Sequence, residues 1–180
     1  MDIKIKSALI SVSDKSGLDV VIKKLHKEEV KLISTGGTAK FIRDMDIPVT
    51  DVSDITNFPE MMDGRIKTLH PNIHGGLLAV RDNQGHKESQ EKYSIENIDL
   101  LIVNLYPFEN TVNTGAKDEI CVENIDIGGP AMLRSASKNH RYVCVISDIS
   151  DYSNLIDELS KNEGKTSLDF RTKCAAITFE

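Results

Sequence analysis

Short apolar runs alternate with amphipathic segments along most of this chain, and this alternation limits its fold more than any other feature. We expect strands at residues 8–12, 32–33, 48–52, 99–104 and 142–146. We expect helices at residues 18–28, 39–45, 85–93, 128–139, 152–159 and 170–179. The run Leu100–Val103 is apolar without alternation, which is typical of a parallel strand buried on both faces. The pattern predicts an α/β fold of three layers, a mostly parallel open sheet flanked by helices.

Charge and composition exclude several classes of protein. The 180 residues carry 22 basic and 28 acidic side chains, a net charge of −6, which disfavours nucleic-acid or membrane-surface binding. No apolar run reaches the length of a membrane span, and residues 1–6 lack the apolar core of a signal peptide. Cys121, Cys144 and Cys174 have no metal-ligand spacing, so we expect buried free thiols in a reducing cytoplasm. These features predict one cytoplasmic domain, residues 1–180, with no metal.

The stretch 56–76 interrupts the alternation and is rich in glycine and proline. A long irregular segment in a compact domain is usually functional or disordered. This one carries Arg65 and Lys67, two cations that face the same way in an extended loop, so we expect it to be functional. A metal pair is not expected from His70 and His74, because the proline between them breaks the helix that such spacing needs.

Polar clusters follow three of the predicted strands. They are Ser11, Ser13 and Lys15 after the first strand, Ser34-Thr35-Gly36-Gly37-Thr38 after the second, and Asn104 and Tyr106 after the fourth. Ligands of open α/β sheets bind at the carboxyl ends of the strands, where these clusters would meet. The Gly36-Gly37 pair before a helix fits either a phosphate cradle or an ordinary turn. It matches neither the P-loop nor the dinucleotide-binding glycine motif.

Two predicted helix starts carry candidate capping residues. Ser16–Asp19 resembles a capping box with Asp in place of Glu. Asp126 is either a helix cap or a carboxylate that accepts a proton from a substrate. Lys138 shares a helix face with Arg134 and lies roughly 12 Å beyond Pro130 along the axis. It would therefore meet Asp126 only at full side-chain length or from a second subunit.

Six ordered motifs resemble a known family. They are Phe58-Pro-Glu-Met61, Gly64-Arg-Ile-Lys-Thr-Leu-His-Pro71, His74-Gly-Gly76, Asn104-Leu-Tyr-Pro-Phe108, Ile125-Asp-Ile-Gly-Gly129 and Lys138-Asn-His140. With the Ile10–Lys15 and Ser34–Ala39 segments, they resemble the IMP cyclohydrolase domain of the PurH family of bifunctional purine biosynthesis proteins. That domain is methylglyoxal-synthase-like, with a Rossmann-like sheet.

The resemblance implies a reaction and a set of site residues. The reaction is the closure of 5-formamidoimidazole-4-carboxamide ribonucleotide to IMP with loss of water, carried out by a homodimer whose cyclohydrolase domain needs no metal or cofactor. The implied catalytic residues are Lys67 as oxyanion donor with Tyr106 nearby, Asp126 on the carboxamide, and Lys138 in proton transfer. The implied substrate-binding residues are Ser11, Ser13, Lys15, Ser34, Thr35, Gly36, Gly37 and Thr38 at the phosphate, and Arg65, Thr68, Asn104, Ile127, Gly128 and Gly129 at the base and ribose.

The family also has a C-terminal formyltransferase domain that uses 10-formyltetrahydrofolate. This chain stops at Glu180, before that domain, so we expect it to lack the formyltransferase activity that its parent protein would have. Two other functions share the phosphate cradle. A methylglyoxal synthase would release phosphate from dihydroxyacetone phosphate, and an allosteric module like that of carbamoyl phosphate synthetases would bind a nucleotide without turnover.

Overall fold

A five-stranded parallel sheet forms the centre of the molecule. The computed structural model describes residues 1–106 and 108–179, so Pro107 of the Asn104–Phe108 motif and the last residue, Glu180, lie outside the described residues. The strand order is β4-β3-β2-β5-β6, and every pairing is parallel. The strands are β2 (Ser7–Val12), β3 (Lys31–Ser34), β4 (Thr50–Asp51), β5 (Leu100–Asn104) and β6 (Cys144–Ile146). The predicted α/β class with a mostly parallel sheet is confirmed.

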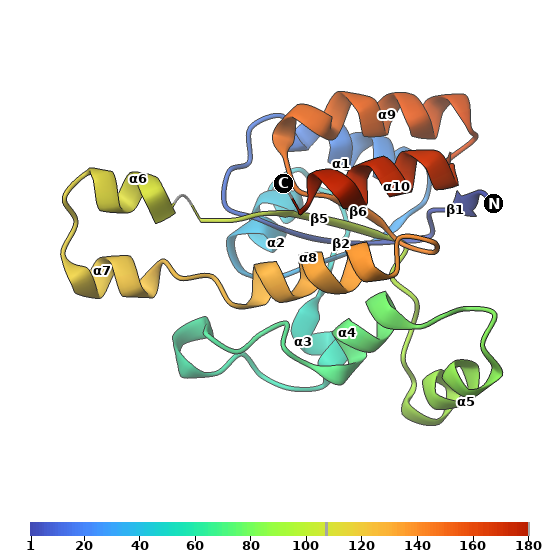
Figure 1. Ribbon diagram of the computed structural model, residues 1–180, viewed down its shortest axis with the longest axis horizontal. Coiled ribbons are helices and arrows are strands. Elements are labelled where there is room, and N and C mark those ends of the chain that lie inside the picture. Colours follow the sequence, from blue (N-terminus) through green and yellow to red (C-terminus); the bar gives the residue numbers. More distant parts are fainter. Residues whose placement is uncertain (107, 180) are drawn as a thin grey trace.

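Helices cover both faces of the sheet, which completes the three predicted layers (Figure 1). On one face, α1 packs against α9, and on the other α8 packs against α4, while α10 contacts both α8 and β6. The helices of the body are α1 (Leu18–Lys27), α2 (Gly36–Arg43), α3 (Val52–Thr56), α4 (Pro71–Leu78), α5 (Gln84–Tyr93), α8 (Gly128–Lys138), α9 (Tyr152–Lys161) and α10 (Leu168–Ile177). Within the described residues, no helix combines the length and apolar character that a membrane span requires.

The core lies between the sheet and these helices. Residues Leu100–Val103 of β5 are 0–1% exposed, as expected for a strand covered on both faces. In α1 the apolar positions Leu18, Val21, Ile22 and Leu25 are all buried, which confirms the helical spacing of that face.

The start of α1 differs from the predicted capping box. Gly17 takes the N-cap position in a left-handed conformation, with φ of 70°, and no side chain caps the helix there. Ser16 instead donates from its backbone N and its Oγ to Asp14 Oδ1, at 2.8 and 2.6 Å. The glycine turns the chain sharply into the helix, so the serine belongs to the preceding loop.

The stretch 56–76 is more ordered than predicted. After α3 it forms the 3₁₀ turn η1 (Met62–Gly64), and α4 then begins at Pro71. His70 is the N-cap of α4, and its ring accepts a hydrogen bond from Asn72 N at 3.2 Å. The expectation that Pro71 breaks a helix was wrong, because a proline in the first helical position needs no amide hydrogen and has a suitable φ.

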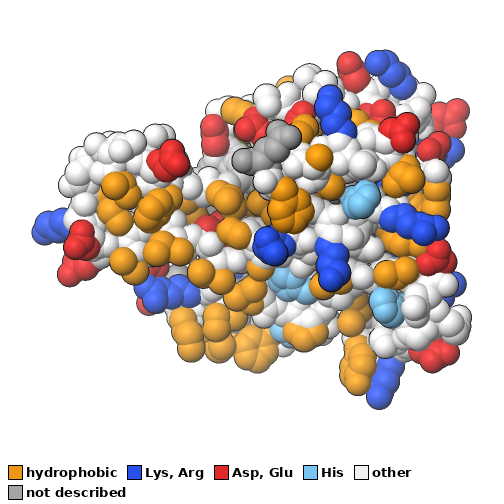
Figure 2. Space-filling model, in the orientation of Figure 1, with side chains coloured by type: hydrophobic (Ala, Val, Ile, Leu, Met, Phe, Trp, Pro, Cys, Tyr) orange, Lys and Arg blue, Asp and Glu red, His pale blue; other side chains and the backbone are white. Residues whose placement is uncertain are grey.

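Two short helices that the sequence pattern did not predict form an arm beside the body (Figure 1). They are α6 (Phe108–Asn113) and α7 (Asp118–Glu123), and together with the flanking residues we call 105–127 the arm. Figure 2 shows apolar side chains gathered along it, including the exposed Val112, Ile120 and Val122. Cys121 lies on α7 and is only partly buried, so the expected burial of all three thiols is confirmed only for Cys144 and Cys174.

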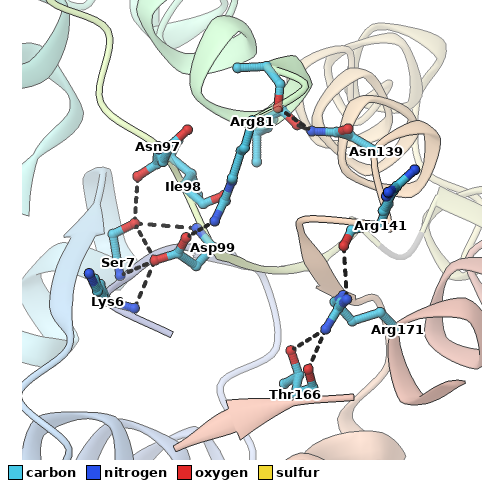
Figure 3. Close-up of polar contacts among 12 residues, drawn as sticks. Lys6, Ser7, Arg81, Asn97, Ile98, Asp99, Asn139, Arg141, Thr166 and Arg171 are labelled. Atoms are coloured by element: carbon cyan, nitrogen blue, oxygen red, sulfur yellow. Dashed lines mark hydrogen bonds and ion pairs between the residues drawn. The ribbon is translucent and has the colours of Figure 1, made fainter. Parts of the chain in front are cut away.

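Two charged side chains hold the amino-terminal side of the sheet together (Figure 3). Asp99, before β5, accepts hydrogen bonds from Lys6 N at 2.8 Å and Ser7 N at 3.0 Å, and pairs with Arg81 at 2.7 Å. The fully buried Arg171 of α10 donates to backbone carbonyls of four residues, Met1, His140, Arg141 and Thr166. Through Thr166 it also holds the small antiparallel pair of β1 (Ile3–Lys4) and β7 (Lys165–Thr166).

Candidate active site

A cavity of about 590 Å³ opens at the carboxyl ends of the central strands. From β2 the chain goes on to β3 and β4 on one side, whereas β5 and β6 lie on the other side. Such a topological switch point is where open α/β sheets bind their ligands. The cavity is lined by residues of the strand ends, of the loop 63–68 and of both legs of the arm: Ser11, Val12, Ser13, Lys15, Thr35, Gly36, Gly37, Thr38, Asp63, Gly64, Arg65, Lys67, Thr68, Asn104, Tyr106, Val122, Glu123, Ile125, Asp126, Ile127, Gly128, Gly129 and Met132.

One end of the cavity presents a helix start and two lysine side chains. The helix α2 begins at Gly36, which has φ of 53°, so the first amide groups of the helix lie at the cavity. A methyl group on Gly37 would lie 3.9 Å from Lys15 Nζ, and one on Gly36 would lie 3.7 Å from Lys67 Nζ. Two ammonium groups therefore stand beside the glycine turn, which favours a phosphate cradle over an ordinary turn.

The opposite wall is formed by the start of α8. Asp126 Oδ1 accepts a hydrogen bond from Gly129 N at 2.9 Å, so this carboxylate caps the helix while it lines the cavity. Asp126 can therefore serve as a helix cap and still present its carboxylate to a ligand in the cavity. A methyl group on Gly128 would lie 2.6 Å from Thr68 Oγ1, so the glycine lets the loop 63–68 lie against the helix.

The loop that carries Arg65 and Lys67 spans the cavity between these two walls. Lys67 lies near the glycine turn of α2, and its Nζ pairs with Glu60 Oε1 at 2.9 Å. Arg65 pairs with Glu123 of α7, which joins this loop to the arm. This contact with Glu123 holds the pKa of Arg65 above its ordinary value and that of Glu123 below its own.

Two residues of the predicted site lie elsewhere, while all the others line the cavity. Ser34 is fully buried, and its Oγ donates to Ile10 O at 2.7 Å inside the sheet. Lys138 is exposed at the last position of α8. That helix has 11 residues, so its ends are about 15 Å apart, and Asp126 lies just before its first residue. Within one chain, Lys138 therefore does not join the other predicted catalytic residues.

Asn104 and Thr38 use their polar atoms within the fold, and Lys15 Nζ also donates to Val12 O at 3.4 Å and Ser13 O at 3.3 Å. Asn104 Oδ1 accepts from Ser13 N at 2.7 Å and Asp14 N at 3.0 Å, and its Nδ2 donates to Asp14 O at 2.7 Å. Thr38 Oγ1 bonds both the N and the O of Val12, at 3.1 and 3.0 Å. Both side chains border the cavity, and both shape the loop after β2 that presents Ser13.

Several lining residues were missed by the sequence reasoning. They are Val12, Asp63, Gly64, Val122, Glu123, Ile125 and Met132. Asp63 and Gly64 directly precede Arg65, so the motif that contains Arg65 could have indicated them. Val122, Glu123 and Ile125 depend on how the arm returns to the body, for which the sequence carries no periodic signal, whereas Val12 ends β2 and Met132 lies on α8. In the part of the chain that the structure describes, no group of three or more His, Cys, Asp or Glu side chains could hold a metal ion.

Comparison with known proteins gives consistent similarities. Residues 17–131 match the family described as MGS-like domain, and residues 136–180 match the AICARFT/IMPCHase bienzyme family. The chain is 58% identical over 172 residues to the bifunctional purine biosynthesis protein PurH of Parvibaculum lavamentivorans, covering 96% of this chain and 32% of that protein. It is 56% identical over 173 residues to PurH of Dinoroseobacter shibae, covering 96% of this chain and 33% of that protein.

The chain thus spans about one third of the length of these relatives. Among solved structures, it is similar to one described as the crystal structure of ForH, with 30% identity and a TM-score of 0.81. That likeness covers 98% of this chain and 91% of the ForH chain.

Proposed function

The chain belongs to the MGS-like domain family, and from this premise we propose that it is an IMP cyclohydrolase of purine biosynthesis. Its relatives are named bifunctional purine biosynthesis proteins, and its last 45 residues match a family whose name includes IMPCHase. The observation that carries the proposal is the cavity itself. One end offers the ammonium of Lys15 and a helix start, the start of α8 offers the carboxylate of Asp126, and Lys67 and Tyr106 line the cavity as further donors.

The phosphate of the ribonucleotide fits the end beside α2. Backbone amides of Gly36 and Gly37, the hydroxyl of Thr35 and the ammonium of Lys15 are the donors that a phosphate dianion needs there. With the phosphate fixed, the ribose and the imidazole base extend toward Thr68 and the start of α8. The net charge of −6 is no obstacle, because these cations are local to the cavity.

The ring closure then takes place between two groups of one substrate. The carboxamide nitrogen attacks the formyl carbon, a C–N bond forms, and the carbonyl oxygen gains negative charge. Asp126 orients the carboxamide and accepts a proton from its nitrogen, and Tyr106 and Lys67 donate to the oxygen. The resulting hydroxyl takes a second proton and leaves as water, while the former formamide nitrogen loses its own proton, so that a C=N bond completes the six-membered ring of the purine. Holding the two groups in contact is itself a large contribution to the rate.

The remaining parts of the proposal follow the family resemblance. We assign the reaction to Lys67, Tyr106 and Asp126, because Lys138 lies away from the cavity within one chain. The domain acts without a metal or cofactor, as a homodimer, in the cytoplasm. The parent protein also carries an AICAR formyltransferase that uses 10-formyltetrahydrofolate.

The test is turnover by the purified chain. It converts the formylated ribonucleotide to IMP without folate, and Lys67→Ala and Asp126→Asn each lower kcat at least about a hundredfold, which is the loss typical of removing one such donor or base. Lys173→Ala, an exposed change on α10, leaves kcat unchanged. A folded wild-type chain that shows only the spontaneous rate overturns the proposal. Release of phosphate from dihydroxyacetone phosphate would identify a methylglyoxal synthase, and nucleotide binding without turnover would identify an allosteric module.

A further inference from the structure

The segment from Glu60 to Lys67 forms a short hairpin that presents Lys67 to the cavity. Met61 N donates to Ile66 O at 3.1 Å, and Ile66 N donates to Met61 O at 3.3 Å, so these two residues are an antiparallel pair. Glu60 and Lys67 are the next opposed positions outward. Opposed residues of an antiparallel pair place their side chains on the same face, which explains why these two meet.

The two side chains lie over the glycine of the hairpin turn. Glu60 Oε1 is 2.9 Å from Lys67 Nζ. A methyl group on Gly64 would lie 2.6 Å from both Glu60 Oε1 and Lys67 Cε. The space occupied by the pair is therefore available only because residue 64 has no side chain.

The turn of the hairpin has an uncommon backbone. Met62, Asp63 and Gly64 have φ values of 54°, 53° and 88°, and a positive φ costs energy at the two residues with side chains. Such strain persists where surrounding contacts hold it, and it concentrates at functional sites. The Glu60–Lys67 pair and the 61–66 hydrogen bonds close this turn, together with hydrogen bonds from Gly64 N to Met61 O and from Arg65 N to Met62 O, each 3.1 Å long.

Only one partner of the pair reaches the cavity. Lys67 lines it, with 30% of its side chain exposed, whereas Glu60 is not part of the wall. A lysine ammonium has three donors on a flexible four-carbon stem. With one donor directed at Glu60, the ammonium stays beside the Gly36 turn and keeps its other donors for a ligand.

We propose that Glu60 is a positioning residue, whose carboxylate holds the Lys67 ammonium in the cavity for the developing oxyanion. The inference rests on the proposed cyclohydrolase function. A partly exposed ion pair such as Glu60–Lys67 usually contributes little to the free energy of folding. Its effect lies in catalysis instead, since an interaction that strengthens in the transition state changes kcat more than KM.

The kinetic test compares Glu60→Gln with Asp54→Asn, an exposed carboxylate on α3 whose removal changes the net charge equally. We expect Glu60→Gln to lower kcat about tenfold with KM within about twofold, and Glu60→Asp to recover part of the loss. In a Lys67→Ala background, Glu60→Gln has no further effect, because the residue acts through Lys67. A Glu60→Gln kcat equal to that of Asp54→Asn, or an equal fold loss with and without Lys67, overturns the inference.

A second measurement separates this inference from the proposed function. After reductive ¹³C-methylation, the NMR resonance of Lys67 is identified by its loss in Lys67→Arg. Glu60→Gln shifts that resonance and Asp54→Asn does not, whether or not the chain turns over substrate. An inactive wild-type chain with this shift overturns the function and retains the pairing, whereas an unmoved resonance overturns the positioning role.

Discussion

The contacts of Arg171 allow the loss of stability on its substitution to be predicted. Its side chain is fully buried, and the guanidinium donates to carbonyl oxygens of Met1, His140, Arg141 and Thr166, the bond to His140 O being 2.8 Å long. These acceptors come from the chain start, the end of α8 with its following turn, and β7. Arg171→Met keeps an unbranched apolar chain as far as the position of the arginine Nε and removes every donor.

The loss of folding free energy depends on how many of these acceptors water cannot reach after the substitution. Met1 and Arg141 are exposed residues, so water can replace the guanidinium at their carbonyls. Thr166 is fully buried and His140 partly buried, which leaves two acceptors without partners. Each costs about 1–3 kcal/mol, and release of the buried charge offsets part of the sum. We expect a net loss of about 3 kcal/mol, or a Tm lower by roughly 6–12 °C.

Urea denaturation followed by circular dichroism measures this loss. Lys173→Met on the exposed side of α10 is the matched control and changes the free energy of unfolding by less than about 0.5 kcal/mol. If Arg171→Met does not fold, Arg171→Lys gives the test, because it keeps the charge with three donors in place of five. A loss below about 1 kcal/mol in Arg171→Met would refute the reasoning, since that is the least that one unsatisfied acceptor should cost.

Three further results are expected. Burial lowers the pKa of His74, so the unfolded chain binds a proton at a pH where the folded chain does not. Stability to urea therefore falls as the pH drops below about 6.5, and the variant His74→Gln shows a weaker dependence on pH. A hydrogen bond with Cys174, together with burial, raises the pKa of the Cys144 thiol, so a thiol reagent modifies only Cys121 in the folded chain and all three cysteines in urea. Gly128→Ala places a methyl group 2.6 Å from Thr68 Oγ1 and lowers kcat/KM about tenfold. An unchanged kcat/KM would show that the loop 63–68 moves to accept the methyl group without loss of activity.

Much of the fold could be predicted because its main elements are long and strongly patterned. The strand β5 is a continuous apolar run, and α1 repeats its buried residues at helical spacing. The helices α6 and α7 have six residues each, too few for a helical period to stand out. Pro71 was misjudged because a proline breaks a helix interior but suits a helix start, and position alone distinguishes the two.

Most of the candidate site could be predicted for a different reason. Parallel strands end at one edge of the sheet, so the polar residues that follow β2, β3 and β5 were bound to meet. Ser34 does not line the cavity, because it is the last residue of β3, is buried, and donates from its Oγ to Ile10 O. The pairing of Arg65 with Glu123 could not be foreseen, because it depends on where the arm returns to the body.

The pairing of β2 with β5 determines at which stage of synthesis the cavity can form. Ser7 and Asp99, which bond across these strands, are 92 residues apart in the chain. Closing so long a loop costs conformational entropy before any contact compensates for it. A chain emerging from the ribosome therefore cannot assemble the cavity until β5 and the start of α8 have been synthesised, although β2, α1 and β3 are complete long before. Until then, the glycine turn at α2 remains an anion cradle without its opposite wall.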